Sequence, residues 1–114
     1  MTDRPLQPLR GASQFQNVFS QPDSRQHAKD VFVLAKRNDG QAHRIGLITS
    51  KKKLRRAVDR NRFRRVAREV LRGHPSAEGL DVIFMVKHAP AELHTAGLYH
   101  QLNDQLTRLV AKLK

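Results

Sequence analysis

The segment from residue 51 to residue 72 constrains the fold most, because it is strongly basic and yet carries a regular apolar repeat. It holds eleven Lys and Arg residues against two acidic ones, which leaves nine of the chain's formal net charge of +12 in this segment. Apolar residues recur at the i, i+3, i+4, i+7, i+8 spacing of one buried helical stripe, at Phe63, Val66, Ala67, Val70 and Leu71. This spacing predicts a helix over residues 57–72, ended by Gly73.

The opposite face of this helix is predicted to bind a polyanion. At about 100° per residue, it carries Asn61, Arg64, Arg65, Arg68 and Arg72. Guanidinium groups are planar forks that can bind two phosphate oxygens at once. A solvated face normally alternates charge sign at four-residue spacing, whereas like charges stack here and destabilise the helix unless an anion neutralises them. A membrane-surface helix would need an exposed apolar face, but the apolar stripe is expected to be buried in the core.

The rest of the chain predicts an α/β sandwich, in which helices pack on one central sheet of about four strands. The expected order is helix, two or three strands, the basic helix, a strand and a last helix. The most apolar run, residues 80–86, is predicted to be the central strand. Residues 30–37 and 44–49 are also predicted strands, and the turn at residues 38–40 indicates that they form an antiparallel hairpin.

The segments toward the two ends are expected to contribute the remaining helices. Ser13 is the predicted N-cap of a short helix through about residue 20, and residues 91–112 form the predicted final helix. Residues 21–30 are polar and are expected to form a loop. Residues 1–11 contain two prolines and a glycine and are expected to be a flexible arm on a single domain, residues 1–114.

The composition limits the chemistry that the chain can perform alone. It has no cysteine, which excludes disulfides, thiolate catalysis and cysteine zinc sites. Its ten acidic residues are scattered and its six histidines lack a metal-ligand spacing, so we expect no catalytic group and no metal site in the protein. Each histidine is expected at the surface or at a helix end. His88, beside Lys87, is the one histidine that we consider as a phosphate contact.

No membrane segment is expected. No apolar run approaches the roughly 20 residues of a membrane span. The first ten residues lack the apolar core of a secretory signal. We therefore expect a cytoplasmic protein without a membrane partner.

Three runs of residues carry a resemblance to a known family. They are Gly-Leu-Ile-Thr-Ser-Lys-Lys at residues 46–52, Arg-Ala-Val-Asp-Arg-Asn-Arg-Phe-Arg-Arg at residues 56–65 and Arg-Glu-Val-Leu-Arg at residues 68–72. Together they closely resemble the protein subunit of bacterial ribonuclease P. Weaker similarity at residues 14–19 and 81–87 extends the resemblance over nearly the whole chain.

The resemblance implies a role in removing the 5′ leader of precursor tRNA, as part of an endoribonuclease that is a ribonucleoprotein. It implies that a large RNA performs catalysis and holds most of the Mg²⁺, and that the protein alone is non-catalytic. The implied partners are the catalytic RNA and precursor tRNA, with one monomeric protein per RNA. The family also implies a left-handed β-α-β crossover through the basic helix, although such crossovers are usually right-handed.

The resemblance also implies two sets of binding residues. Together with the charge pattern, it predicts that the catalytic RNA binds Lys51, Lys52, Lys53, Arg56, Arg60, Asn61, Arg62, Arg64, Arg65, Arg68 and Arg72. A cleft for the 5′ leader is predicted at Phe15, Phe19, Phe32 and Lys87. For Phe15 and Phe19, plain packing in the core is the alternative interpretation.

Two other classes of protein remain as alternatives. A ribosomal or RNA-chaperone-like RNA-binding protein without a processing role would have the same charge and fold class, but it would not explain the context of the Arg-Asn-Arg run. A basic DNA-binding protein would also have this charge. However, the basic helix lacks the preceding helix and tight turn of a helix-turn-helix.

Overall fold

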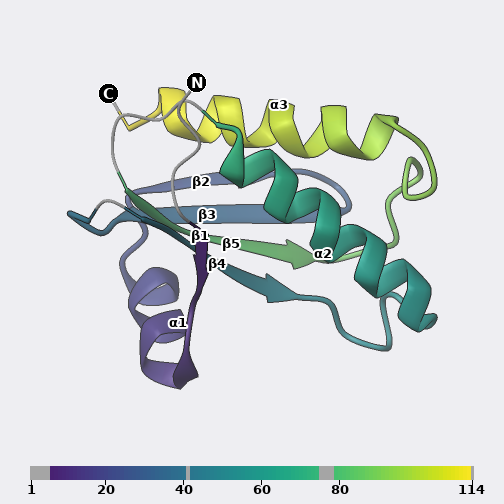
Figure 1. Cartoon of the computed structure of the whole chain (residues 1–114), viewed down its shortest axis with the longest axis horizontal. Helices are drawn as coiled ribbons and strands as arrows, with labels where there is room; N and C mark the ends of the chain where they lie inside the picture. Colours follow the sequence, from purple (N-terminus) through teal and green to yellow (C-terminus); the bar gives the residue numbers. More distant parts are fainter. Residues whose placement is uncertain (1–5, 41, 75–78, 114) are drawn as a thin grey trace.

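The computed structural model describes residues 6–40, 42–74 and 79–113. Figure 1 shows helices on both sides of one sheet, which confirms the predicted α/β class. In chain order the elements are β1 (Leu6–Pro8), α1 (Gly11–Ser20), β2 (Ser24–His27), β3 (Val31–Arg37), β4 (His43–Ile48), α2 (Ala57–Arg72), β5 (Leu80–Val86) and α3 (Gly97–Ala111).

The five described strands form one sheet in the order β1-β4-β5-β3-β2. β5 is the central strand, as predicted, and every residue in it except Met85 is buried. It pairs parallel with β4 and antiparallel with β3. A strand that is apolar on both faces is stable only where both faces are covered, which explains its place in the middle of the sheet.

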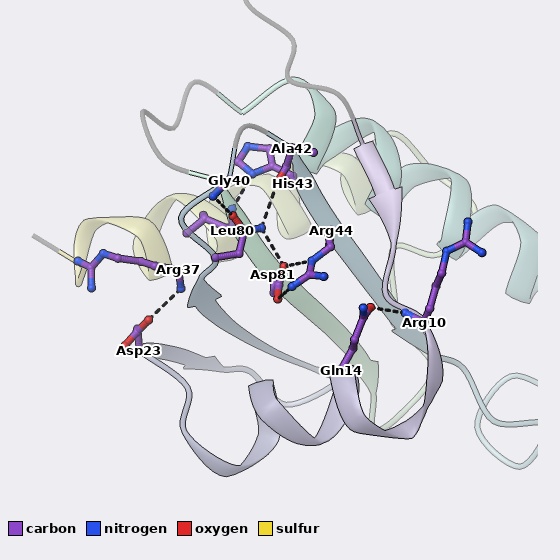
Figure 2. A network of polar contacts seen from close by, with 11 residues as sticks. Arg10, Gln14, Asp23, Arg37, Gly40, Ala42, His43, Arg44, Leu80 and Asp81 are labelled. Atoms are coloured by element: carbon purple, nitrogen blue, oxygen red, sulfur yellow. Dashed lines mark hydrogen bonds and ion pairs between the residues drawn. The ribbon is translucent and has the colours of Figure 1, made fainter.

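The predicted hairpin of β3 and β4 is wrong, because β5 lies between these two strands. The turn after β3 binds the start of β5 instead of closing a hairpin. The Asn38 side chain of this turn donates to Asp81 at 2.9 Å. At the start of β5, the Leu80 N–H donates to Nδ1 of His43, the first residue of β4, at 3.1 Å (Figure 2). The turn residues indicated a reversal of the chain correctly, but a reversal does not require the two strands to be neighbours.

The helix α2 connects the parallel neighbours β4 and β5. In Figure 1 α2 crosses in front of the sheet, the arrows of both strands point to the right, and β5 lies above β4. This arrangement is a left-handed crossover. The expectation from the family resemblance is confirmed, and the usual right-handed rule does not apply here.

The two faces of the sheet are covered differently. Alternate residues of β3 and β5, such as Val33 and Phe84, face α2 and α3 and form the larger core. The residues between them, such as Leu34 and Ile83, pack with Val18 of α1 in a smaller core. The apolar stripe of α2 is buried as predicted, and its bounds agree with the prediction.

The N-terminal segment is more ordered than expected. Leu6–Pro8 is a strand that pairs parallel with β4, and the Leu9 N–H donates to the Ile45 carbonyl at 2.8 Å. The predicted arm is therefore wrong for these residues, and residues 1–5 lie outside the described residues. The helix α1 begins before Ser13, which is not its N-cap. Arg10 holds that position, and its N–H donates to the Gln14 side chain at 2.6 Å (Figure 2).

Two further boundaries differ from the predictions. The expected loop at residues 21–30 contains β2, a polar edge strand paired with β3. Its Ser24 hydroxyl is buried and donates to the Leu109 carbonyl of α3 at 2.8 Å, so a hydrogen bond fixes this strand in place of apolar packing. The last helix begins at Gly97 and not near residue 91, because the preceding residues form turns that bury Leu93.

Candidate RNA-binding surface

The outer face of α2 presents a strip of unneutralised arginines. Arg65, Arg68 and Arg72 are exposed and Arg64 is half-buried. None of these four side chains has a hydrogen bond or ion pair to another residue in the described part of the chain. Since Arg64, Arg68 and Arg72 follow one another at four-residue spacing, they lie about 6 Å apart along the helix axis. The strip therefore offers a row of free donors to an anion.

The arginines of the Arg-Asn-Arg run have different surroundings. Arg60 donates from Nη1 to the carbonyls of Leu54 and Arg55, at 2.9 Å each. Arg62 donates to the carbonyl of Leu93 at 2.6 Å and to that of Thr95 at 3.3 Å. Both side chains thus hold neighbouring loops. Because the acceptors are neutral carbonyls, the positive charges stay available, and a guanidinium keeps further N–H donors.

The connection before α2 adds a second group of cations. Lys51, Lys52, Lys53 and Arg56 are all exposed. The Ser50 carbonyl accepts hydrogen bonds from the N–H groups of Lys53 and Leu54 at 3.1 and 2.9 Å, which closes a turn. Leu54 is buried and anchors that turn in the main core. The structure therefore brings the predicted basic residues together on the connection and on one helix.

Two depressions border the arginine strip. The larger has a volume of about 510 Å³ and lies between α2 and the β1 edge of the sheet. Its lining includes Phe15, Leu47, Arg64, Arg68 and Arg72. The smaller has a volume of about 260 Å³ and is lined by Val58, Asn61, Arg62 and Arg65. The strip is thus a ridge between two hollows and not a flat cationic surface.

The predicted leader residues lie mainly on the other face of the sheet. Phe15, Phe19 and Phe32 are half-buried and pack on the smaller core. The ring of Phe32 also stacks on His27, with 4.0 Å between centroids and 11° between planes. Each phenylalanine thus contributes to core packing and keeps part of its ring exposed.

The fourth predicted leader residue, Lys87, lies at the end of the sheet. It is half-buried and follows the last residue of β5. Its main-chain N–H donates to the Asp30 carbonyl at 2.7 Å, which places it beside the start of β3. Phe32 is the second residue of that strand, so Lys87 and Phe32 lie near the same end of the sheet.

Gly46 of β4 makes room for Phe15. A Cβ atom at this position would lie 2.7 Å from Cε2 of Phe15 and 2.9 Å from Cδ1 of Leu9. Both distances are far below van der Waals contact, so any side chain here would displace the Phe15 ring. A role for Gly46 in positioning a candidate RNA-binding aromatic was not apparent from the sequence.

The sequence reasoning also missed an ion pair on the α1 side of the sheet. Arg44 donates from Nε and Nη2 to the two carboxylate oxygens of Asp81, at 2.7 and 2.6 Å (Figure 2). This hydrogen bond raises the pKa of Arg44 further above its usual value, against the opposing effect of burial. The signal was available, since a lone aspartate in an otherwise apolar strand requires a partner.

One histidine contradicts the expectation that each lies at the surface or a helix end. His43 is fully buried at the start of β4 and accepts the Leu80 hydrogen bond. His74 follows α2 and is a helix-end residue, as expected. It is buried, and burial lowers its pKa. His88 is exposed, as a phosphate contact would need to be.

The described ranges contain neither a cluster of metal-ligand side chains nor a helix that could span a membrane. Residues 6–40, 42–74 and 79–113 contain no group of three or more His, Asp or Glu side chains that could hold a metal ion. No helix within these ranges has the length and apolarity needed to cross a membrane.

Comparisons with known proteins identify the family. A family model described as Ribonuclease P matches residues 5–112. The ribonuclease P protein component of Marinomonas sp. is 38% identical over 108 residues, which cover 91% of this chain and 82% of that protein. The ribonuclease P protein component of Acinetobacter baylyi is 36% identical over 107 residues, which cover 93% of this chain and 82% of that protein. The chain therefore belongs to the ribonuclease P protein family, and the resemblance is confirmed.

Solved structures agree with this assignment. The ribonuclease P protein of Staphylococcus aureus superimposes with a TM-score of 0.68 and 26% identity, covering 94% of each chain. The ribonuclease P protein of Thermotoga maritima has a TM-score of 0.71 and covers 95% of this chain and 98% of its own. At 21% identity the second comparison supports the fold alone.

Proposed function

We propose that this chain binds the catalytic RNA of ribonuclease P through the outer face of α2, and that the complex removes the 5′ leader of precursor tRNA. Membership of the family supports a role as a tRNA-processing subunit. The observation that carries the proposal is the strip formed by Arg64, Arg65, Arg68 and Arg72, which have no partner in the described part of the chain.

The energetics of the strip favour an RNA ligand. Like charges four residues apart destabilise a helix by about 0.2–0.5 kcal/mol per pair. Each phosphate neutralised by an arginine releases a counterion. The slope of log K against log salt concentration becomes more negative by about 0.9 for a duplex or 0.7 for a single strand. The four free arginines therefore destabilise the helix only slightly in the free protein, and they contribute strongly to RNA affinity.

The second part of the proposal concerns the 5′ leader. Single-stranded RNA is held by stacking of its bases on aromatic rings and by cations along its backbone. The half-exposed rings of Phe15, Phe19 and Phe32 offer such contacts, and Lys87 offers a cation near Phe32. Phe15 also lines the larger depression together with Arg64 and Arg68, so the two proposed binding surfaces adjoin.

Catalysis is proposed to belong to the RNA. We propose that Mg²⁺ is held mainly by RNA phosphates, where it would activate water and stabilise the leaving oxygen. The protein contributes affinity, the position of the leader and a positive field that favours a compact RNA. We propose one protein per catalytic RNA, acting in the cytoplasm, with no chemical step on a protein side chain.

Reconstitution tests the proposal. The protein, the catalytic RNA and Mg²⁺ are combined with 5′-labelled precursor tRNA at moderate salt. We expect no cleavage by the protein alone, and mature 5′ ends at a higher rate with both subunits than with RNA alone. No stimulation by the protein, together with co-sedimentation with ribosomal subunits, would instead favour the RNA-binding protein without a processing role.

A further inference from the structure

Val58 is an exposed apolar residue on a surface that is otherwise cationic and polar. It is 56% exposed, and Tyr99 is the other large hydrophobic residue that is exposed in the described ranges. Val58 lies in the first turn of α2, three residues before Asn61 and seven before Arg65. Residues at these spacings lie on one side of a helix. The aliphatic side chain therefore sits among donors for phosphate, where it gains nothing from contact with a phosphate.

The smaller depression surrounds this side chain. Val58, Asn61, Arg62 and Arg65 line it, and most of its surface is apolar. One wall is held in place, because Arg62 is hydrogen-bonded to the carbonyls of Leu93 and Thr95. The hollow is thus formed before any ligand binds, and a ligand does not have to order this wall.

The lining defines the chemistry of the occupant. Val58 offers an apolar contact, the exposed Asn61 amide offers one acceptor and two donors, and Arg65 offers a fork for an anion. A group that can contact all three side chains at once has a flat apolar face, a polar edge and an adjacent negative charge. A nucleotide has this combination in its base and phosphate.

The base must be unstacked to use this hollow. In a regular RNA helix the base faces are covered by their neighbours, and proteins contact mainly phosphates and 2′-hydroxyls. Bases in loops and bulges can leave the stack and expose a face to a protein. We propose that the depression around Val58 binds one unstacked base of the partner RNA, with the base face on Val58 and its edge on Asn61.

This inference rests on the proposed function and names the part of the RNA that the hollow takes. It is tested with Val58→Thr, which keeps the shape of the side chain and replaces a methyl group by a hydroxyl. Val58→Ile keeps the site apolar, and Ala57→Ser changes an exposed neighbour that does not line the hollow. Circular dichroism verifies the fold of each variant. Binding to the catalytic RNA is measured over a range of salt concentrations, and base-specific chemical probing maps exposed base edges with and without protein.

We expect Val58→Thr to weaken RNA binding about fivefold, with an unchanged salt slope, because an apolar contact releases no counterion. At least one unpaired nucleotide protected by the wild-type protein should become reactive again. Ala57→Ser should retain the affinity and the protection, whereas Val58→Ile should weaken binding less than Val58→Thr because the contact stays apolar.

The inference fails if Val58→Thr binds like the wild type, or if the affinity falls while no unpaired base changes reactivity. The second result would indicate a ribose or backbone contact in a duplex. If the wild-type protein does not bind this RNA at all, the proposed function itself fails, so the two failures are distinguishable.

Discussion

Arg62 donates a 2.6 Å hydrogen bond from Nε to the main-chain carbonyl of Leu93 and thereby ties α2 to the turn before α3. Leu93 is buried in the main core, so the acceptor is held firmly. Arg62 belongs to the Arg-Asn-Arg run, which the sequence assigned as a whole to RNA binding. The structure gives this arginine a second role in holding the fold.

The first prediction is that Arg62 contributes to the stability of the fold whereas Arg65 does not. Arg62→Ala should lower the free energy of unfolding by about 1–2 kcal/mol, because the hydrogen bonds from a charged donor to the carbonyls of Leu93 and Thr95 are lost. Arg65→Ala, on an exposed position without a partner in the described ranges, should change it by less than about 0.5 kcal/mol. Urea denaturation measures both values. Equal midpoints for Arg62→Ala and the wild type would show that the loop is held by other contacts.

The second prediction concerns Gly46. Gly46→Ala places a Cβ atom 2.7 Å from the Phe15 ring, so the ring must move, and the unfolding free energy should fall by about 1–3 kcal/mol. Binding of a single-stranded leader RNA should weaken in the same variant if Phe15 contacts the leader. Fluorescence anisotropy with a labelled leader oligonucleotide measures this.

Gly73→Ala is the matched control. A Cβ atom there would be no closer than 3.4 Å to its nearest neighbour, the Glu69 carbonyl, and the φ angle is −85°. Both stability and leader binding should be retained. Unchanged leader binding in a folded Gly46→Ala protein would exclude Phe15 from the leader site.

The third prediction is a pH dependence of stability from His74. Burial lowers the pKa of this side chain in the folded protein, so the unfolded chain binds a proton first as the pH falls. Stability should therefore be complete above the unfolded pKa of about 6.5 and decline below it, by at most about 1.4 kcal/mol per pH unit.

A His74→Gln variant isolates this contribution. The wild type and the variant share every other titrating group. The unfolding free energy of each protein is measured at pH 7.5 and pH 5, and the difference between the two proteins in the change with pH reports on His74. The variant should lose less stability over this range. An identical loss in both proteins would contradict a lowered pKa of His74.

The bounds of α2 and the place of β5 could be predicted because local patterns determine them. An apolar repeat of helical spacing ended by Gly73 specifies a helix, and a strand that is apolar on both faces must be central. β2 could not be predicted, because it is polar and its position depends on Ser24 reaching the Leu109 carbonyl. The pairing of β3 with β5 likewise depends on contacts far apart in the sequence.

In the candidate site, too, local patterns could be predicted from the sequence and contacts between distant segments could not. The exposed face of α2 followed from periodicity alone, and all the predicted RNA-binding residues lie on α2 or on the connection before it. The functions of Arg60, Arg62 and Gly46 in positioning their neighbours could not be read from the sequence, because their partners belong to other segments of the chain. Whether RNA binds these residues stays a prediction.

The salt dependence of binding to the catalytic RNA shows whether the arginine face of α2 binds this RNA. The wild type is compared with a variant in which Arg64, Arg65, Arg68 and Arg72 are all replaced by alanine, after both are shown to be folded. We expect the magnitude of the logarithmic salt slope to fall by about 3 in the variant, with a large loss of affinity at moderate salt. An unchanged slope in the folded variant would contradict the assignment of this helix face to RNA.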